Sequence, residues 1–203
     1  MNIKIRKVKN SDVKYAILLS QMYKESAQAR KTGIALRSPE YIITKIEKGD
    51  AIIALEKEKL VGFCYIETFT GGEYVSNSGL IVDPAYRGQG LAKSIKKEVL
   101  SLARDRYPKA EVFGITTSPV VMNINFGLGY KPVPFSKLTK DDQFWNGCKT
   151  CVNFDVLTRN EKELCLCTGM IAPSGEAIKN GNAKTSTSRM ERLKKLFSKK
   201  EKA

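Results

Sequence analysis

The chain has 203 residues, of which 42% are hydrophobic and 28% are charged, and this is enough for one domain with a hydrophobic core. Its formal net charge of +14 suits an anionic ligand, either nucleic acid or a polyanionic small molecule. The sequence contains no histidine, so Ser-His-Asp and Cys-His catalysis are excluded, and a general base must be a carboxylate, Lys, Tyr, Cys or a water chain.

The N-terminal segment and the apolar runs predict where the protein resides. Residues 1–10 carry charges but lack the apolar stretch of a signal peptide. No apolar run is long enough to cross a bilayer. We therefore expect a cytoplasmic protein without a transmembrane segment.

The first third of the chain has the pattern of a strand, two helices and a hairpin. Apolar residues alternate at the start, and helical spacing follows until Gly33 interrupts it. Ser38 and Pro39 are typical of a helix start, because Ser caps the first turn and Pro fits within it. The charged turn EKEK joins two apolar runs as a hairpin. The expected elements are a strand at 3–8, helices at 12–30 and 38–49, and strands at 51–55 and 60–69.

The middle of the chain alternates between strands and helices, and its end is strand-like. Antiparallel strands followed by one crossover helix predict a mixed sheet in an α/β domain. The expected elements are a strand at 74–82, a helix at 91–107, a strand at 111–118, a short helix at 119–129, and strands at 148–158 and 162–170.

The composition changes after Pro173 to Gly, Ser, Asn and Lys. Residues 174–203 carry nine Lys/Arg and three Asp/Glu. We expect residues 1–173 to form the folded domain and residues 174–203 a basic tail. Within the tail, residues 174–187 are predicted to be a flexible linker, and residues 189–203 have the pattern of a short amphipathic helix.

The segment DPAYRGQGLA, residues 83–92, lies between a predicted strand and a predicted helix. A strand that runs into a glycine loop and then a helix leaves backbone N–H groups pointing outward, and the helix dipole favours an anion there. Gly88 and Gly90 permit a close approach, and Arg87 adds a fork of donors for phosphate oxygens. The turn is therefore suited to a pyrophosphate. Three lysines add positive potential along the helix: Lys93, Lys96 and Lys97.

The sequence Arg87-Gly88-Gln89-Gly90-Leu91-Ala92 matches R/Q-x-x-G-x-G/A, the signature of the GNAT superfamily of N-acetyltransferases. The preceding strand Leu80-Ile81-Val82 matches as well, and so does the order of predicted elements. Residues 1–157 thus resemble this superfamily. The resemblance implies the acyl-CoA N-acyltransferase fold, an α/β (α+β) mixed domain whose central, mostly antiparallel and splayed sheet is flanked by helices.

The resemblance also implies that the protein binds acetyl-CoA as a co-substrate. The backbone amides from Arg87 through Ala92 would hold the pyrophosphate, and the strand Leu80–Val82 would pair with the pantetheine arm through Ile81 and Val82. A bulge in this strand would splay it from strand 111–118 and open a slot for the arm. The phosphates of such a cofactor account for much of the basic charge, which weakens the case for a nucleic-acid partner.

In this superfamily an amine attacks the thioester, and a carboxylate acts as base directly or through water. The candidate bases are Glu67 and Glu73, and the N–H of Val82 is a candidate donor to the oxyanion. Many members carry a Tyr that protonates the leaving thiolate, but alignment on Gly129-Tyr130 places Asn125 there. Asn cannot donate such a proton and can only hydrogen-bond the sulfur or pantetheine. We therefore assign no acid.

The acceptor pocket of the superfamily lies beside the loop between the first two helices. In this loop Arg30, Lys31 and Arg37 could bind a carboxylate. The segments ARKTGIALRSPEY and CLCTGM also resemble bacterial members associated with arginine biosynthesis, which implies a small amine acceptor such as glutamate. The alternatives are a protein or peptide N-acetyltransferase and a non-catalytic acyl-CoA-binding module. A homodimer is a candidate assembly.

Four cysteines form two close pairs near the end of the domain. Cys148 and Cys151 are a C-x2-C pair, and Cys165 and Cys167 a C-x-C pair. Four thiolates could hold a zinc ion, although the superfamily does not generally need one. Alternation on a strand would instead place Cys165 and Cys167 on one face, where thiols simply pack. We favour buried thiols over zinc, and a disulfide least of all.

Overall fold

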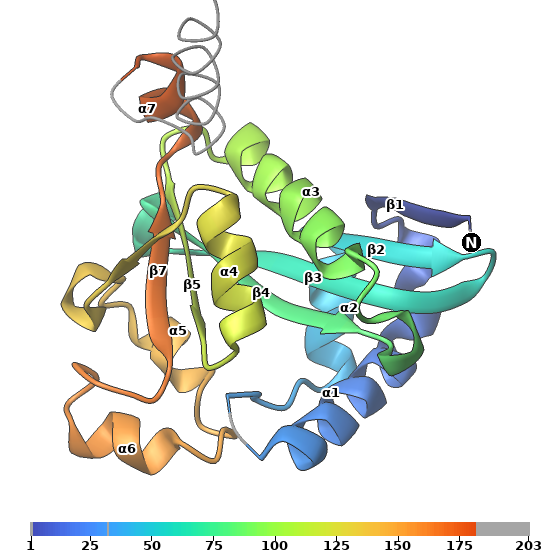
Figure 1. Ribbon diagram of the computed structural model, residues 1–203, viewed down its shortest axis with the longest axis horizontal. Coiled ribbons are helices and arrows are strands. Elements are labelled where there is room, and N and C mark those ends of the chain that lie inside the picture. Colours follow the sequence, from blue (N-terminus) through green and yellow to red (C-terminus); the bar gives the residue numbers. More distant parts are fainter. Residues whose placement is uncertain (1, 32, 182–203) are drawn as a thin grey trace, which may run out of the picture.

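The structure is a computed structural model that describes residues 2–31 and 33–181. Seven strands form a single sheet in the order β1-β2-β3-β4-β5-β7-β6, and only β4 and β5 run parallel (Figure 1). This confirms the predicted mixed, mostly antiparallel sheet. The strands are β1 (Ile3–Lys7), β2 (Ala51–Glu56), β3 (Lys59–Phe69), β4 (Tyr74–Val82), β5 (Glu111–Thr116), β6 (Lys131–Val133) and β7 (Thr168–Ala172).

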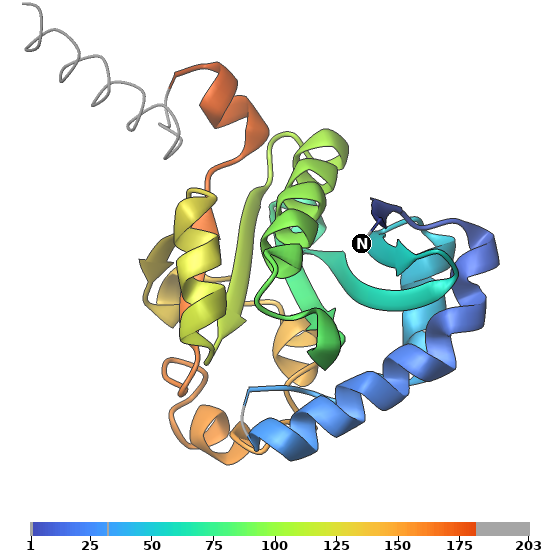
Figure 2. The ribbon, with the colours of Figure 1, turned by 45° about the vertical axis from the view of Figure 1, so that its right-hand side comes forward.

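Helices cover both faces of the sheet (Figure 2). α3 buries Ile95 and Val99 against one face, whereas α1 and α2 bury Leu19 and Ile42 in a second core on the other. The amphipathic spacing of these helices supplies the apolar stripe that each core needs. The helices are α1 (Ala16–Arg30), α2 (Pro39–Glu47), α3 (Leu91–Arg106), α4 (Pro119–Gly127), α5 (Asp142–Asn146), α6 (Phe154–Arg159) and α7 (Gly175–Lys179).

Most predicted elements before residue 130 are confirmed. The Ser38 Oγ accepts a hydrogen bond from Tyr41 N at 3.2 Å, as expected of a helix cap. β2 and β3 form the predicted hairpin. Residues 10–15 form a 3-10 turn, η1 (Asn10–Tyr15), so the first α-helix starts later than expected, at Ala16.

The predicted strand at 148–158 is wrong. This segment forms a turn followed by α6, because Phe154 and Leu157, three residues apart, pack on a third core that contains Trp145. The other predicted strand, 162–170, starts only at Thr168, so Cys165 and Cys167 lie in the loop before β7. β6 and α5 were not predicted from the sequence.

The predicted linker differs from the structure at its beginning. Residues 175–179 form α7, and Glu176 N donates to Pro108 O at 2.8 Å while Arg104 donates to Pro173 O at 3.2 Å. The first residues after Pro173 are therefore folded against α3 rather than irregular. The domain boundary at Pro173 stays a prediction, and the predicted tail helix at 189–203 lies outside the described residues. No helix within residues 2–31 and 33–181 is long and apolar enough to cross a membrane.

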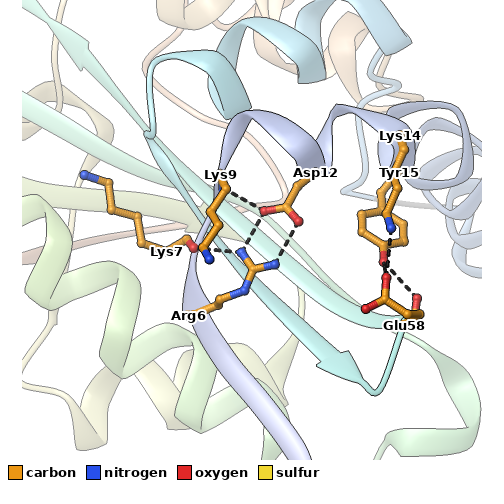
Figure 3. Close-up of polar contacts among 7 residues, drawn as sticks. All are labelled: Arg6, Lys7, Lys9, Asp12, Lys14, Tyr15 and Glu58. Carbon is orange, nitrogen blue, oxygen red and sulfur yellow. Dashed lines mark hydrogen bonds and ion pairs between the residues drawn. The ribbon is translucent and has the colours of Figure 1, made fainter.

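A buried carboxylate joins β1 to the first helical turn (Figure 3). Asp12 is 2% exposed and accepts two hydrogen bonds from Arg6, at 2.7 and 2.8 Å, and one from Lys9 N at 2.7 Å. The hydrogen bond from Arg6 is the main cause that lowers the pKa of Asp12. A nearby surface pair, Lys14 and Glu58 at 2.8 Å, is exposed to water.

We expect Asp12→Asn to lower the free energy of unfolding at neutral pH by about 2–3 kcal/mol, because the amide leaves Arg6 without its buried counter-charge. The folded pKa of Asp12 is depressed, so its contribution is present above the unfolded pKa of about 3.9 and is lost as the pH falls through the folded value. Chemical denaturation across this pH range should therefore show the variant and the wild type converging in acid. Glu58→Gln serves as the control and should leave the midpoint unchanged at every pH.

Candidate active site

β4 and β5 part from one another shortly after they meet. They pair only from Tyr74–Ser76 with Glu111–Phe113. The register of β4 with β3 shifts by one residue between the pairs Ile81–Phe63 and Ser78–Tyr65, which marks a bulge at Gly79 and Leu80. Gly79 has a φ of +63°. The predicted bulge and splay are thus confirmed, and they leave a slot through the middle of the sheet.

A cavity of about 490 Å³ occupies this slot and the space beside it. One side is formed by the α1–α2 loop, by Tyr65 and Glu67 of β3, and by the segment 143–167. The other side is formed by Lys96 of α3 and by Val121 and Asn125 of α4. The cavity therefore passes between β4 and β5 and joins the two faces of the sheet.

The glycine turn between β4 and α3 is exposed, and the N–H groups from Gly88 through Ala92 find no acceptor in the described part of the chain, whereas Arg87 N donates to Pro84 O at 3.3 Å. A short 3-10 turn, η3 (Pro84–Tyr86), is capped by Asp83, and Gly88 and Gly90 then adopt φ values of +77° and +78°. The first turn of α3 has no intrahelical acceptors for its N–H groups. The Arg87 Nε donates to Val82 O at 3.2 Å. This is the geometry expected of an anion-binding helix N-terminus.

The backbone of β4 next to the slot alternates in direction. Asp83 N donates to Val61 O at 3.0 Å, so this pair is hydrogen-bonded across β3 and β4. Because antiparallel pairs alternate, Ile81 also directs its N–H and C=O toward β3, whereas Val82 directs them toward the slot. Ile81 and Val82 were both predicted to pair with the pantetheine arm, and only Val82 has a backbone orientation that allows it.

Glu67 lies in the cavity, and Glu73 does not. Glu67 accepts a hydrogen bond from the Tyr41 hydroxyl at 2.7 Å and forms an ion pair with Lys45, which is itself buried. Glu73 is exposed in the turn before β4 and does not line the cavity. Of the two candidate bases, only Glu67 faces the space where an acceptor could bind.

Of the three basic residues predicted to bind the acceptor, Arg37 is the best placed. Its Nε donates to the Tyr65 hydroxyl at 2.6 Å, and one terminal nitrogen donates to Leu36 O at 2.9 Å. Arg30 lines the cavity from an exposed position, and Lys31 is exposed and does not line it.

The charge of Arg37 has no counter-charge among the described residues. It forms no ion pair there. Burial raises the pKa of both Tyr65 and Tyr41, so these phenols are neutral near neutral pH and cannot supply a negative charge. An anionic group entering the cavity would complete this cluster.

Two polar residues, Asn125 and Lys96, line the opposite side of the cavity, and the sequence predicted a cofactor contact for the first and a surface position for the second. Asn125 is 2% exposed, its amide nitrogen donates to Met170 Sδ at 3.6 Å, and its Oδ1 lacks a hydrogen-bond partner within the described part of the chain. Lys96 was expected to extend the basic surface of the helix but is buried, with 2% exposed. The signal was present in the sequence, because Lys96 lies beside the apolar stripe formed by Leu91, Ile95 and Val99.

Tyr41, Tyr65 and Lys45 were not identified from the sequence. They lie on different elements, α2 and β3, and only the packing of these elements brings them together with Glu67. The Ser38-Pro39 cap, which fixes where α2 begins, was the one local signal that could have placed Tyr41.

All four cysteines of the two pairs line the cavity as free, partly buried thiols. Burial raises the pKa of Cys148 to about 11, so the thiol form is favoured at neutral pH. In residues 2–31 and 33–181, no three Cys, Asp or Glu side chains form a group that could hold a metal ion. The zinc hypothesis therefore finds no support in the geometry.

The profile of the Acetyltransferase (GNAT) family matches residues 19–122, half of the chain, including the slot and the glycine turn. The chain belongs to the GNAT acetyltransferase family. No curated protein sequence matches it.

Solved acyl-transfer enzymes with the names below share the fold at low sequence identity. N-acetylglutamate synthase from Neisseria gonorrhoeae, complexed with coenzyme A and N-acetyl-glutamate, has a TM-score of 0.61 and 14% identity, over 86% of this chain and 35% of that chain. Phosphinothricin acetyltransferase from Sinorhizobium meliloti, in complex with AcCoA, has a TM-score of 0.58 and 16% identity, and the match covers 87% of this chain and 90% of that chain. Ribosomal-protein-S18-alanine N-acetyltransferase from Escherichia coli has a TM-score of 0.54 and 12% identity, and the match covers 85% of this chain and 94% of that chain. The chain thus spans about a third of the Neisseria protein and most of the other two.

We expect Gly79→Ala to destabilise the protein by about 3 kcal/mol, because the added Cβ meets Tyr65 Cδ1 at 2.7 Å and Tyr23 Oη at 2.8 Å in a left-handed backbone. Gly71→Ala is the matched control, since Gly71 has the same φ of +63° but open space around it. The control should cost about 1 kcal/mol, the strain alone. Equal losses in urea denaturation would show that the bulge does not depend on this contact.

Proposed function

We propose that the protein is an acetyl-CoA-dependent N-acetyltransferase whose acceptor is a small primary amine that carries a carboxylate, such as an amino acid. The observation that carries this proposal is one cavity that reaches Leu80 and Ile81, just before the glycine turn, and that is also lined by Arg37, which forms no ion pair among the described residues. CoA or AcCoA in solved structures of the same fold supports the choice of co-substrate. A cytoplasmic location and a homodimer stay predictions.

The residues present fit the phosphates and the arm of acetyl-CoA. The N–H groups from Gly88 through Ala92 surround the start of α3, where the helix dipole also favours negative charge. The N–H of Arg87, also predicted to bind phosphate, donates to Pro84 O at 3.3 Å. The pantetheine arm would follow the edge of β4 that β5 leaves unpaired, and Val82 would offer its N–H as a strand does, while its C=O also accepts from Arg87. CoA supplies the thioester, and the chain supplies its placement.

The chain's own groups suit amine attack on a thioester. The acceptor amine must lose a proton, and Glu67 is the carboxylate in the cavity that can take it, directly or through water. Lys45 and Tyr41 hold this carboxylate in place. The N–H of Val82 faces the slot and can donate to the oxyanion that forms at the attacked carbonyl.

A small acidic acceptor fits the cavity better than a protein does. Arg37 is held by Tyr65 and Leu36 and has no counter-charge within residues 2–31 and 33–181, which is an arrangement suited to binding a carboxylate by charge-assisted hydrogen bonds. The Neisseria relative is described with N-acetyl-glutamate, which is consistent with an acceptor of this class. The Escherichia coli relative, named for ribosomal protein S18, represents the alternative of a protein acceptor.

We expect Gly90→Val to weaken coenzyme A binding by at least about tenfold, because a branched side chain cannot easily hold φ +78° and would block the approach of phosphate to the amides. Isothermal titration calorimetry on the folded variants measures this. Gly71→Val, at a left-handed position in the distant turn before β4, should bind coenzyme A as the wild type does. Unchanged binding by Gly90→Val would refute the pyrophosphate site.

We expect Arg37→Gln to raise the KM for amino-acid acceptors by about 10–100-fold, the equivalent of the 1.5–3 kcal/mol of a charge-assisted hydrogen bond. The KM for the matching amine without a carboxylate should not change. Steady-state assays of CoA release with both acceptors test this, with Lys31→Gln as the control because Lys31 lies outside the cavity. An equal effect on both acceptors would argue against carboxylate recognition by Arg37.

A further inference from the structure

α3 buries a cation against the sheet. Lys96 is 2% exposed, and its Nζ lies 5.4 Å from the centroid of the Tyr130 ring. It makes no hydrogen bond or ion pair with the residues that the structure describes. Burying an ammonium group without a partner is costly, and a methionine of similar size would cost less. The ring of Tyr130 can offset part of this cost, but packing alone does not require an amino group here.

The titratable groups that face Lys96 do not balance its charge. They are Cys64 of β3 and Tyr130, which lies between α4 and β6. Burial raises the pKa of Cys64 to about 11 and also raises the pKa of Tyr130, so both are neutral near neutral pH. Burial lowers the pKa of Lys96 itself, which brings its titration closer to that of a thiol.

Lys96 lies beside the bulge of β4, where the slot passes through the sheet. Cys64 is opposite the bulge, and its Sγ donates to Asn77 Oδ1 and to Ser78 O, both at 3.2 Å. Lys96 and Asn125 line the cavity together from the side opposite Arg37 and Glu67. The Oδ1 of Asn125 is unpartnered within the same described region. Two unsatisfied polar groups thus face the passage that an acyl thioester would follow.

We propose that Lys96 donates the proton that the CoA thiolate takes up when the acetyl group leaves it. This proposal rests on the proposed function. The amine nitrogen forms a bond to the carbonyl carbon, and the carbon–sulfur bond then breaks with its electron pair going to sulfur. The ammonium of Lys96 passes one proton to that sulfur and becomes an amine. The proton that the acceptor nitrogen loses goes to Glu67 or water and returns to Lys96 through solvent, so the products are the acetamide and CoA thiol.

Lys96 would fill the role of the acid that protonates the leaving thiolate, a role to which the sequence pattern assigned no residue. Asn125 stands where many relatives carry a tyrosine but has no proton of suitable acidity to give. It can orient the sulfur or an amide of the arm, while a lysine whose pKa is lowered by burial is a stronger proton donor than an ordinary lysine.

The first test does not require an acceptor. The ultraviolet absorbance of thiolate is titrated for the CoA complex against the complex with desulfo-CoA, in the wild type and in Lys96→Met. We expect the bound thiol to titrate at least about one pH unit lower in the wild type, because the ammonium stabilises the thiolate. Lys109→Met, an exposed lysine beyond α3, is the matched control and should behave as the wild type. Identical titration in the wild type and Lys96→Met would overturn the proposal.

The second test measures turnover. We expect Lys96→Met to lower kcat by about 100-fold, with coenzyme A affinity within about threefold of the wild type. The alkaline fall of kcat in the wild type should also disappear in the variant. Its melting temperature should not fall, because the change removes an unpaired buried charge at nearly constant volume. Retained kcat, or an equal loss of affinity and kcat, would overturn the role as acid.

The two proposals can fail separately. If the thiol titration shifts but no amine is acetylated, Lys96 contacts the sulfur as proposed and the transferase proposal fails. If the wild type acetylates amines and Lys96→Met does so equally well, the transferase proposal holds and the role of Lys96 is refuted.

Discussion

The separation of β4 from β5 is the constraint on which the rest of the structure depends. β4 bulges at Gly79, whose carbonyl accepts a hydrogen bond from Tyr23 and whose left-handed backbone leaves room for the ring of Tyr65. β5 can then pair with β4 over only three residues. Side chains donate to some carbonyls of β4 beyond Ser76, namely those of Ser78, Gly79 and Val82. The N–H of Val82 still faces the slot, and a backbone N–H in such a place needs a partner. A ligand that behaves as a strand can supply it.

The cavity between β4 and β5 is lined on each side by a cation that lacks a carboxylate partner in the described part of the chain. Arg37 faces it from the α1–α2 loop, and Lys96 faces it from α3, and neither forms an ion pair among the residues described. Glu67, the carboxylate in the cavity, is already paired with Lys45. A fold that buries cations without carboxylates is stabilised when anionic ligands arrive, and the proposed reactants, a CoA thioester and an acidic amine, both carry such charge.

The wall of the cavity beyond the slot is held by aromatic packing rather than by regular secondary structure. Phe144 contacts Phe113 and Trp145, each at 4.8 Å between ring centroids with edge-on geometry. The indole nitrogen of Trp145 donates to Thr139 O at 2.9 Å. Such contacts stabilise a segment of short helices and turns that has few backbone ladders. They also help to place the cysteine pairs beside the cavity, since α5 comes just before Cys148 and α6 lies between the two pairs.

The sequence by itself determined the features that depend on neighbouring residues. The Ser38-Pro39 cap, the hairpin of β2 and β3, and the glycine turn before α3 follow from local dihedral preferences and hydrogen bonds, and these persist in any tertiary setting. The segment 148–158 was mistaken for a strand because a short apolar run fits both periods, and its contacts with Trp145 decided for a helix. Only the tertiary structure could separate Glu67 from Glu73, bring Tyr41, Tyr65 and Lys45 together with Glu67, and bury Lys96. Burial and charge pairing are set by residues distant in the chain, and no local pattern encodes the distance between them.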